Sequence, residues 1–411
     1  MSSKSVIVVG GGAAGLMAAR TAAQNGANVI IIEKNEKIGR KILITGKGRC
    51  NITNFCDNDE FISNIPTNPR FMYSAINAFA TYDTIAFFEE LGVSTKVERG
   101  NRVFPVSDKA SDVADALRKS ALDSGCKIIT DTVVALLHQD GRVVGVKTEK
   151  QKYYSDRVIV CTGGKSYPKT GSTGDGYKFA KSVGHKVVSP TPSLVPLVSD
   201  DASCKALQGL ALKNVAVSVY DNNASKEIYS DFGELLFTHF GLSGPTVLSA
   251  SAHMKDINNT SYTVHIDLKP ALDEKTLDKR LLKDFAKFIN KDICNSLFEL
   301  MPKSLIPVVL DICNIDPHTK CNSITQKQRE SIVNTLKDFT VKIKGFRPID
   351  EAIITCGGVS VNEIDPKTMK SKIADNLYFA GEVIDVDAYT GGFNLQIAFS
   401  TGYLAGLHSS Q

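Results

Sequence analysis

The chain has 411 residues, which predicts two or three domains and a large buried core. Hydrophobic residues make up 43% of the chain and charged residues 22%, so the composition is that of a folded globular protein and excludes a largely disordered one. The formal net charge of +4 is too small to indicate nucleic-acid binding by itself, and no apolar run is long enough to cross a membrane.

The first stretch of the chain carries its strongest motif. Residues 5–33 predict an apolar strand, a G-x-G-x-x-G turn formed by Gly10, Gly12 and Gly15, a helix, a second strand and then Glu33. In a dinucleotide-binding βαβ unit such glycines allow a tight turn, close approach of a pyrophosphate and close helix packing. An acid after the second strand suits a ribose with a free 2′-hydroxyl, which disfavours NADP. The motif alone leaves FAD and NAD open.

The sequence predicts a cytoplasmic protein. Lys4 precedes an apolar run, as in a signal peptide, but three consecutive glycines interrupt that run and argue against secretion. The nine cysteines are scattered, odd in number and without a C-x-x-C motif, so we expect reduced thiols and no disulfide framework. The seven histidines show no metal-ligand spacing, and we predict no metal site.

A basic, glycine-rich segment follows at residues 34–54. It has three interpretations: a solvated loop, a nucleic-acid-binding patch, or a loop that returns over the dinucleotide and offers main-chain donors. The third fits the opening motif best. Cys50 has two interpretations. The cation of Arg49 beside it could lower the pKa of the thiol and make it reactive, or Cys50 is simply a small loop residue without chemistry, which the sequence favours at least equally.

The next part of the chain predicts helices and then strands. Apolar spacing indicates helices at 71–91 and 111–124. Three strands, at 127–137, 142–148 and 157–160, are expected to form a small antiparallel meander. The last of them ends in a turn of small residues, Cys161 to Gly164, where backbone can approach a ligand closely.

Changes in composition mark two insertions. Prolines 190, 192 and 196 indicate a linker, strands then dominate to about residue 268, and a charged helical pattern follows. We predict a dinucleotide-binding domain at 1–189 and 355–411, an inserted β domain at 190–270 and 338–354, and an inserted helical domain at 271–337.

The C-terminal segment returns to the first fold. A strand at 377–382 ends in Gly381 and Glu382, and a helix at 390–405 begins with Gly391 and Gly392. This helix start is a second place where main-chain donors can meet an anionic ligand. An NAD dehydrogenase does not need this return, whereas a two-part flavin nucleotide site does, so the sequence favours FAD.

Seven motifs together carry a family resemblance: GGGAAGLMAA with Glu33, GRKILITGKGRCNITN, RVFPVSDKASDV, CTGGKSYPKTGSTGDGY, FTHFGLSGPTVLSAS, ITCGGVSVNEIDPKTM and YFAGEVIDVDAYTGGFNLQIAFSTG. Along essentially its whole length the chain resembles the BaiN/YhiN-like family of bacterial flavoproteins, also called NAD(P)/FAD-dependent oxidoreductases or aminoacetone oxidase family FAD-binding enzymes. The resemblance implies an α/β fold, with a glutathione-reductase-type FAD-binding Rossmann domain, an inserted β-barrel-like domain and a small helical domain.

The resemblance also implies where FAD binds. The pyrophosphate is expected over the first glycine turn, the adenosine ribose on Glu33, the adenine at the backbone of Val134, and the flavin between the basic loop and the C-terminal return. The predicted cofactor-binding residues are Gly10, Gly12, Ala13, Ala14, Gly15, Glu33, Lys34, Lys41, Gly48, Arg49, Cys50, Asn51, Val134, Thr162, Gly163, Gly381, Glu382, Gly392, Phe393, Asn394, Leu395 and Gln396.

Three hypotheses for function follow. The first is reduction of an unsaturated, enone-like small molecule with electrons from NAD(P)H, which would visit the substrate pocket because no second G-x-G-x-x-G unit exists. The second is an amine or alcohol oxidase that uses oxygen, and the third, which we expect least, is a flavoprotein that binds or modifies RNA through residues 40–49. Tyr167, His239 and Tyr389 are candidate proton donors, each more often a structural residue. The substrate and the oligomeric state stay open.

Overall fold

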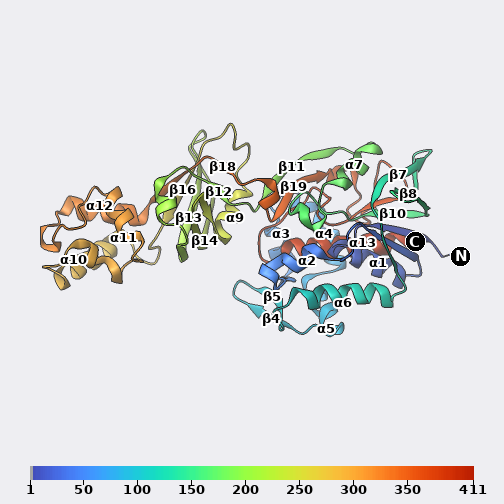
Figure 1. Cartoon of the computed structure of the whole chain (residues 1–411), viewed down its shortest axis with the longest axis horizontal. Helices are drawn as coiled ribbons and strands as arrows, with labels where there is room; N and C mark the ends of the chain where they lie inside the picture. The colour runs from blue at the N-terminus through green and yellow to red at the C-terminus, as the bar shows by residue number, and fades with distance from the viewer. Residues whose placement is uncertain (1–2) are drawn as a thin grey trace. The chain divides into compact units, whose positions relative to one another are not determined.

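The computed structural model describes residues 3–411, which divide into two compact units. The first unit contains the residues up to Ser193 and from Pro348 onwards, and the second contains Leu194–Arg347. Figure 1 shows the chain pass from the first unit into the second in yellow-green and return in orange. The second unit holds most of both predicted insertions, and the three-domain boundaries stay a prediction.

A five-stranded parallel sheet forms the centre of the first unit, in the order β20–β10–β1–β2–β6. Its middle strand is buried on both faces, since Val6, Ile7 and Val8 are at most 1% exposed, as expected for a parallel sheet. The five strands are β1 (Ser5–Val9), β2 (Asn28–Glu33), β6 (Lys127–Thr130), β10 (Arg157–Val160) and β20 (Leu377–Phe379). Both ends of the chain therefore build one sheet, and the predicted Rossmann-type FAD-binding fold is confirmed.

The first and last helices of the chain, α1 (Ala13–Gln24) and α13 (Phe393–Ser409), pack against each other. Two glycines on α13 allow the close approach. A Cβ atom on Gly402 would lie 2.5 Å from the carbonyl oxygen of Ala14, and one on Gly406 would lie 2.3 Å from that of Ala18. Larger residues at these two positions would force the helices apart.

The predicted antiparallel meander is wrong in two of its three strands. The segment expected at 127–137 is two strands that belong to different sheets, with Asp131 and Thr132 between them. The meander that forms consists of β7 (Val133–Gln139), β8 (Arg142–Thr148) and β9 (Lys152–Tyr154). The apolar strand β10 instead lies parallel to β1 in the buried central sheet.

The expected proline linker also contains a strand. β11 (Val187–Ser193) pairs with β19 (Ile354–Val359) in a two-stranded ribbon, with a register shift between Val188 and Thr191. Proline is tolerated in such an edge strand because no second neighbour needs its missing N–H.

The expected helix at 71–91 is interrupted. It breaks at Phe79 and Ala80, where the Asp83 carboxylate accepts from Ala80 N and starts a new helix. The other elements of the first unit are short helices and a small three-stranded sheet: α2 (Arg40–Ile44), α3 (Asn58–Ser63), α4 (Tyr73–Ala78), α5 (Thr81–Glu90), α6 (Ala110–Asp123), α7 (Asp175–Ser182), β3 (Thr53–Asn54), β4 (Thr95–Glu98) and β5 (Arg102–Pro105).

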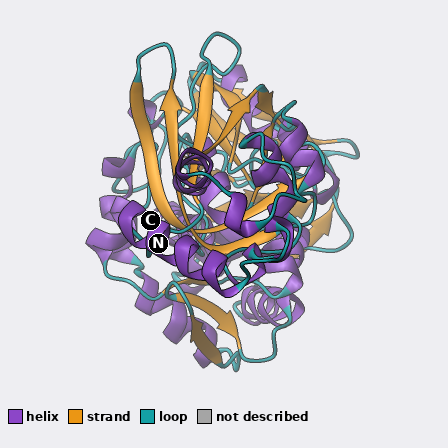
Figure 2. Ribbon diagram, turned by 90° about the vertical axis from the view of Figure 1, so that its left-hand side faces the viewer, coloured by secondary structure: helices purple, strands orange, loops and turns teal. Residues whose placement is uncertain are grey.

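The second unit contains a seven-stranded antiparallel sheet in the order β17–β16–β13–β14–β15–β12–β18. Only Lys344 separates its two end strands along the chain, so the sheet must curl back on itself as a barrel does. The long, curved strands in Figure 2 show this shape. The strands are β12 (Leu197–Val198), β13 (Ala211–Asp221), β14 (Lys226–Thr238), β15 (Gly241–Ser243), β16 (Tyr262–Asp267), β17 (Phe339–Ile343) and β18 (Gly345–Phe346).

Helices complete the second unit and share one apolar core with the sheet. Leu281 of α10 and Val309 of α11 are fully buried in the same cluster as Val264 of β16. The helices are α8 (Ala202–Ala206), α9 (Pro245–Ser251), α10 (Glu274–Lys287), α11 (Leu305–Ile312) and α12 (Gln326–Lys337). Among residues 3–411, no helix is both long enough and apolar enough to span a bilayer.

Candidate functional site

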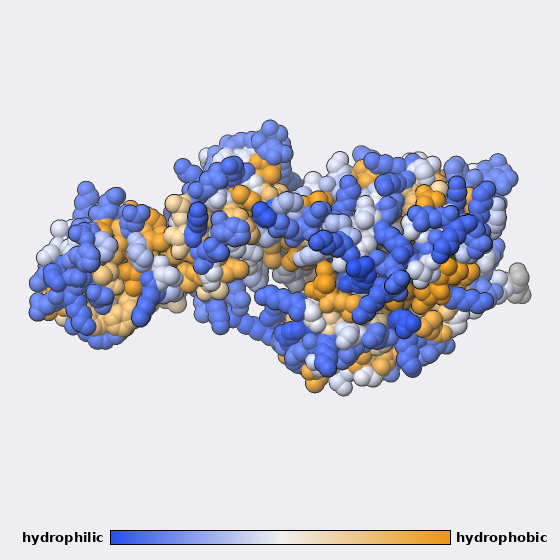
Figure 3. Space-filling model, viewed as in Figure 1, coloured by the Kyte–Doolittle hydropathy of each residue, from blue (hydrophilic) through white to orange (hydrophobic). Residues whose placement is uncertain are grey.

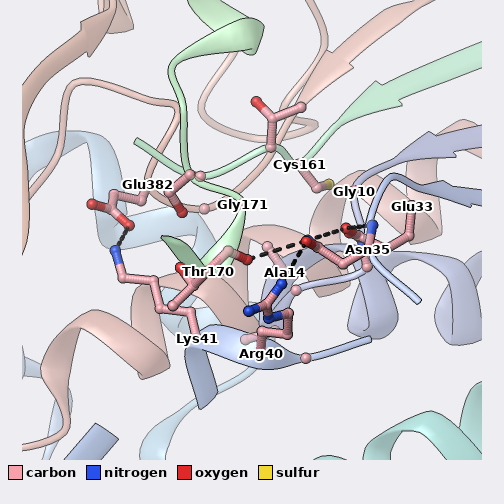
Figure 4. Close-up of a pocket in the computed structure, with 18 of the residues that line it drawn as sticks. Gly10, Ala14, Glu33, Asn35, Arg40, Lys41, Cys161, Thr170, Gly171 and Glu382 are labelled. Carbon is pink, nitrogen blue, oxygen red and sulfur yellow. Dashed lines mark hydrogen bonds and ion pairs between the residues drawn. The ribbon is translucent and has the colours of Figure 1, made fainter. Parts of the chain in front are cut away.

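A groove in the first unit opens at the carboxyl ends of the central strands, where open α/β sheets bind their ligands. Several segments that are far apart in the sequence line it, and four of them contain most of the predicted residues. These four are the glycine turn after β1, the segment from Glu33 to Thr45, the turn after β10, and Gly381 with Glu382 after β20. Figure 4 shows these segments meeting around one space.

The three motif glycines have separate structural reasons. Gly10 has φ +101°, and a Cβ there would lie 2.6 Å from the carbonyl oxygen of Cys161. A Cβ on Gly15 would lie 2.0 Å from the carbonyl oxygen of Gly10, so this glycine lets α1 pack on the turn. A Cβ on Gly12 would meet nothing within 4 Å, because this residue borders the open groove. The middle position therefore keeps the groove open above the first turn of α1.

The first turn of α1 offers main-chain donors to the groove. Gly12 is the N-cap and has no side chain to accept from the first N–H groups, and the turn contains no acidic residue. Ala13 and Ala14 line the groove with their small side chains. Free N–H groups and the positive end of the helix dipole make this a site for an anion such as a pyrophosphate.

The carboxylate of Glu33 organises the edge of the groove. One oxygen accepts from Gly11 N at 2.7 Å, and the other accepts from Asn35 N at 2.8 Å and from Asn35 Nδ2 at 2.7 Å. A carboxylate has about four acceptor positions, so one position is left for a ligand hydroxyl. The bonds to Gly11 and Asn35 were not predicted from the sequence, and they tie the acid to the glycine turn.

Four cationic residues line the groove, Lys34, Lys37, Arg40 and Lys41, and two of them are paired with carboxylates. Lys41 Nζ donates to Glu382 at 2.5 Å and to Ser166 Oγ at 2.6 Å, while Lys34 Nζ bonds Asp175 at 2.9 Å. Arg40 instead donates to the neutral amide of Asn35 at 3.0 Å and keeps its charge uncompensated among the described contacts. Figure 4 shows Lys41 reaching Glu382 across the groove. The pairing of Lys41 joins the basic segment to the C-terminal return.

Two buried polar atoms of groove residues have no hydrogen-bond partner among the described residues. They are Thr162 Oγ1, in the turn after β10, and Asp131 Oδ2, between β6 and β7. Buried polar groups are almost always satisfied in native proteins. Both atoms are closed off from solvent, so they are exceptions inside the protein wall and do not face the open groove.

Most of the predicted cofactor-binding residues meet at this groove. Those that line it are Gly10, Gly12, Ala13, Ala14, Glu33, Lys34, Lys41, Thr162, Gly163, Gly381, Glu382, Asn394 and Leu395. Gly15 packs beneath the glycine turn. Val134 does not line the groove, because its side chain points to solvent and is 46% exposed, and the neighbouring Val133 lines it instead. Arg40 lines the groove as part of the basic segment expected to return over the dinucleotide. Groove residues that were not predicted individually include Asn35, Asp131 and Asp175.

The remaining predicted residues lie outside the groove lining, and their role stays a prediction. Gln396 is fully buried and bonds Thr53 Oγ1, whereas Phe393 packs against Phe61. Gly392 is the N-cap of α13, and Gly48 and Asn51 lie in the loop after α2. This loop does not reach the groove beyond Thr45.

Of the two interpretations of Cys50, the reactive thiol is wrong. Burial raises the pKa of Cys50 to about 12, because a thiolate there would be removed from water. The neighbouring cation does not act on it, since the Arg49 guanidinium pairs with Glu98 and Asp108 and lies 4.2 Å from the Phe104 ring centroid. Arg49 therefore serves a surface ion-pair network.

None of the three candidate proton donors lines the groove. Tyr167 has a left-handed backbone with φ 50°, and burial raises its pKa. Tyr389 donates its backbone N–H to Asn64 O. His239 belongs to the second unit, where its ring contacts Phe240.

A buried carboxyl in the C-terminal return was also missed. Asp387 is 1% exposed, and one of its oxygens accepts from Ser193 Oγ at 2.7 Å while the other has no partner among the described residues. Burial raises the pKa of Asp387, as it does that of the neighbouring Asp385. Burial therefore disfavours the charged form of both carboxyl groups.

Comparison with known proteins decides the family. The model of the HI0933-like protein Rossmann domain matches residues 4–408. The chain belongs to this family. The resemblance predicted from the motifs is thereby confirmed, and it extends along the whole chain.

Curated relatives of this family member have two different names. It is 32% identical over 408 residues to the 3-dehydro-bile acid delta(4,6)-reductase of Clostridium scindens, covering 97% of both chains. It is 30% identical over 398 residues to the ribosomal RNA dihydrouridine synthase of Escherichia coli, covering 97% of this chain and 96% of the relative. The Haemophilus influenzae protein of the same name is 31% identical over 412 residues, covering 98% of both chains.

Solved structures support the fold. The 3-ketosteroid delta1-dehydrogenase of Sterolibacterium denitrificans aligns with a TM-score of 0.52 and 12% identity, covering 99% of both chains. A 3-ketosteroid-delta4-(5alpha)-dehydrogenase from Rhodococcus jostii aligns with a TM-score of 0.51 and 14% identity, covering 99% of this chain and 96% of the other. At this identity the likeness concerns the fold alone.

Proposed function

We propose that the chain is an FAD-dependent oxidoreductase that reduces a carbon–carbon double bond conjugated to a carbonyl group, with NAD(P)H as a transient electron donor. The observation that carries the proposal is the groove over the first turn of α1, with its open Gly12 and the Glu33 carboxylate at its edge. The names of the relatives supply the reaction class. A delta(4,6)-reductase of a 3-dehydro bile acid and a dihydrouridine synthase both saturate a double bond conjugated to a carbonyl.

The residues of the groove fit FAD. The N–H groups of Ala13 and Ala14 and the cation of Arg40 would hold the pyrophosphate, and the free acceptor position of Glu33 would hold a ribose hydroxyl. FAD supplies the hydride and electron chemistry when it is bound.

The protein contributes orientation and electrostatics. The first turn of α13 begins at Gly392 and contains no acidic residue, so its N–H groups favour negative charge in a ligand placed there. Asn394 holds the preceding loop, since its side chain donates to Ala388 O at 2.7 Å and accepts from Ala388 N at 2.9 Å. The helix start is thereby fixed before a ligand arrives, which is the arrangement that electrostatic stabilisation requires.

The test is an anaerobic absorbance titration of the purified protein with NADH and then NADPH. We expect a yellow protein whose flavin absorbance is bleached by one of the two and restored by a 3-oxo-4-ene steroid. A colourless protein that does not take up FAD contradicts the cofactor assignment. Bleaching by an amine or alcohol, but by neither nicotinamide, contradicts the reductase and favours an oxygen-dependent oxidase.

The second candidate function is reduction of uridine in RNA, which the two dihydrouridine synthase relatives favour. The chemistry of the groove is the same, and the substrate is a uracil ring presented by a folded RNA. Ribosomal RNA incubated with the protein and NAD(P)H should gain two hydrogen atoms at one uridine, measured by mass spectrometry of nuclease fragments. RNA of unchanged mass, alongside a reduced enone, contradicts this candidate.

A further inference from the structure

The second unit carries a basic surface that the proposed reductase chemistry does not use. Five lysines follow one another at intervals of four residues along α10 and the segment after it: Lys275, Lys279, Lys283, Lys287 and Lys291. Residues four apart lie on neighbouring positions of one helix face. The spacing therefore gathers positive charge along one side of α10, which lies in the orange part of Figure 1.

This face is exposed and contains no acidic side chain after the first residue of the helix. The exposed residues of α10 beyond Glu274 are Lys275, Thr276, Lys279, Leu282, Lys283, Ala286 and Lys287. The acidic residues of α10 are already used, since Asp278 accepts from Arg329 and the buried Asp284 accepts from Arg280. Within residues 3–411, no ion pair involves the first three lysines, so their charges are uncompensated.

Aromatic rings lie at the far end of the same face. The ammonium groups of Lys287 and Lys291 lie 5.0 and 4.9 Å from the centroid of the Phe288 ring. The centroid of the Phe288 ring lies 5.5 Å from that of Phe298, whose side chain is 46% exposed. The side chain of Ile289, which follows Phe288 in the sequence, is 51% exposed. Figure 3 shows hydrophobic residues next to hydrophilic ones on the part that holds α10, α11 and α12. Lysines beside exposed aromatic rings are typical of surfaces that bind single-stranded nucleic acid.

We infer that the α10 face, defined by the five lysines with Phe288 and Phe298, binds the phosphate backbone and unpaired bases of RNA. The inference rests on the RNA-reducing form of the proposed function. It replaces the basic loop at residues 40–49 as the RNA contact, because Arg49 is paired with two carboxylates and Lys41 is paired with Glu382. Of the lysines on α10, Lys287 pairs with Glu299 at 2.6 Å, whereas Lys275, Lys279 and Lys283 have no ion-pair partner among the described residues and can neutralise phosphates.

The test is fluorescence anisotropy of a labelled oligouridylate of about 20 nucleotides, titrated with the full-length protein at about 0.05 to 0.2 M salt. The variant combines Lys275→Gln, Lys279→Gln and Lys283→Gln. For single strands, each lost phosphate contact lowers the salt slope by about 0.7, so we expect a change of about 2 in the slope and at least tenfold weaker binding. Phe298→Leu should weaken binding by about fivefold or more with the same slope, because it removes stacking without removing charge.

The matched control combines Lys205→Gln, Lys213→Gln and Lys226→Gln, three exposed lysines of the same unit away from α10. It removes the same charge and should keep wild-type affinity. Equal losses in the two triple variants, or a wild-type protein that does not bind at low salt, would overturn the inference. FAD absorbance and its bleaching by NAD(P)H are measured on the same preparations. If the α10 variant loses RNA binding but keeps its flavin response, the loss is due to this surface and the proposed function is unaffected. If the wild-type protein binds RNA but is colourless, the proposed function fails and the RNA-binding surface does not.

Discussion

The glycine turn gives a sharp test because two alanine substitutions in it should change different quantities: one the stability of the fold and the other the affinity for FAD. In Gly15→Ala the new methyl group would lie 2.0 Å from the carbonyl oxygen of Gly10, well inside ordinary contact distance, and the nearest atoms are backbone. Helix α1 must move away from the turn, and overpacking of this kind costs about 1 to 3 kcal/mol of unfolding free energy. In Gly12→Ala the methyl group meets no protein atom within 4 Å, and the backbone angles of −81° and −169° are open to any residue.

The folding cost of Gly12→Ala is therefore small. Alanine is a poorer N-cap than glycine, by about 0.5 to 1 kcal/mol, but it restricts the unfolded chain by about 0.4 to 1 kcal/mol, and the two terms oppose each other. The methyl group does stand in the groove, where it keeps a pyrophosphate from the first N–H groups of α1. We expect FAD to bind at least about tenfold more weakly, which corresponds to about 1.4 kcal/mol.

Two measurements on the two variants separate these effects. Urea unfolding of the apoprotein gives stability, and titration of FAD followed by quenching of its fluorescence gives affinity. Gly12→Ala should lose affinity and keep its stability, whereas Gly15→Ala should lose stability first. Wild-type FAD affinity in Gly12→Ala would refute the assignment of the groove, and wild-type stability in Gly15→Ala would refute the packing of α1 on the turn.

Three further predictions concern single side chains. Glu382→Gln should lower the unfolding free energy by about 2 kcal/mol in urea unfolding, because the largely buried Lys41 loses its charge partner, and an unchanged midpoint would mean that the pair is solvated. Cys50 should stay unmodified when the native protein is treated with N-ethylmaleimide near pH 8, since burial raises its pKa to about 12; rapid labelling in a peptide mass map would contradict this. Burial lowers the pKa of His185, so the unfolded chain binds the proton more readily and the unfolding free energy should fall as the pH drops below about 6.5. That part of the pH dependence should be missing in His185→Gln, and an equal change in unfolding free energy between pH 7.5 and 5.5 in wild type and variant, measured by urea unfolding, would contradict it.

The sequence predicted the parts of the fold that local patterns encode. The turn at Gly10 to Gly15 and the strands on each side of it follow from glycine spacing and apolar runs, and the structure has them where they were expected. The strand at 157–160 shows the limit. Its apolar residues fit a strand in either sheet, and only the tertiary contact with β1 decides that it is buried and parallel.

The groove shows the same limit for the site. Glu33 was predicted because it follows a strand at the right distance, whereas Asn35 and Asp131 belong to the groove only because the chain folds back on them. The side chain of Arg49 was misread for a related reason. A run of basic residues does not reveal that Glu98 and Asp108, from elsewhere in the chain, neutralise one of them.

The place of the second unit in the sequence explains how a site can be built from both ends of a chain of this length. The entire segment Leu194–Arg347 separates the two halves of the first unit. A flexible loop ten times longer than another costs only about 2 kcal/mol more to close, since closure entropy grows with the logarithm of length. Here even that cost is reduced, because the segment holds its own ends together. Leu197 near its start pairs with Phe346 near its end, and Ser193 pairs with Ile354 on the other side of the crossing. The two crossing strands thus bring the C-terminal return beside the β1 turn, and the Lys41–Glu382 pair fixes it there.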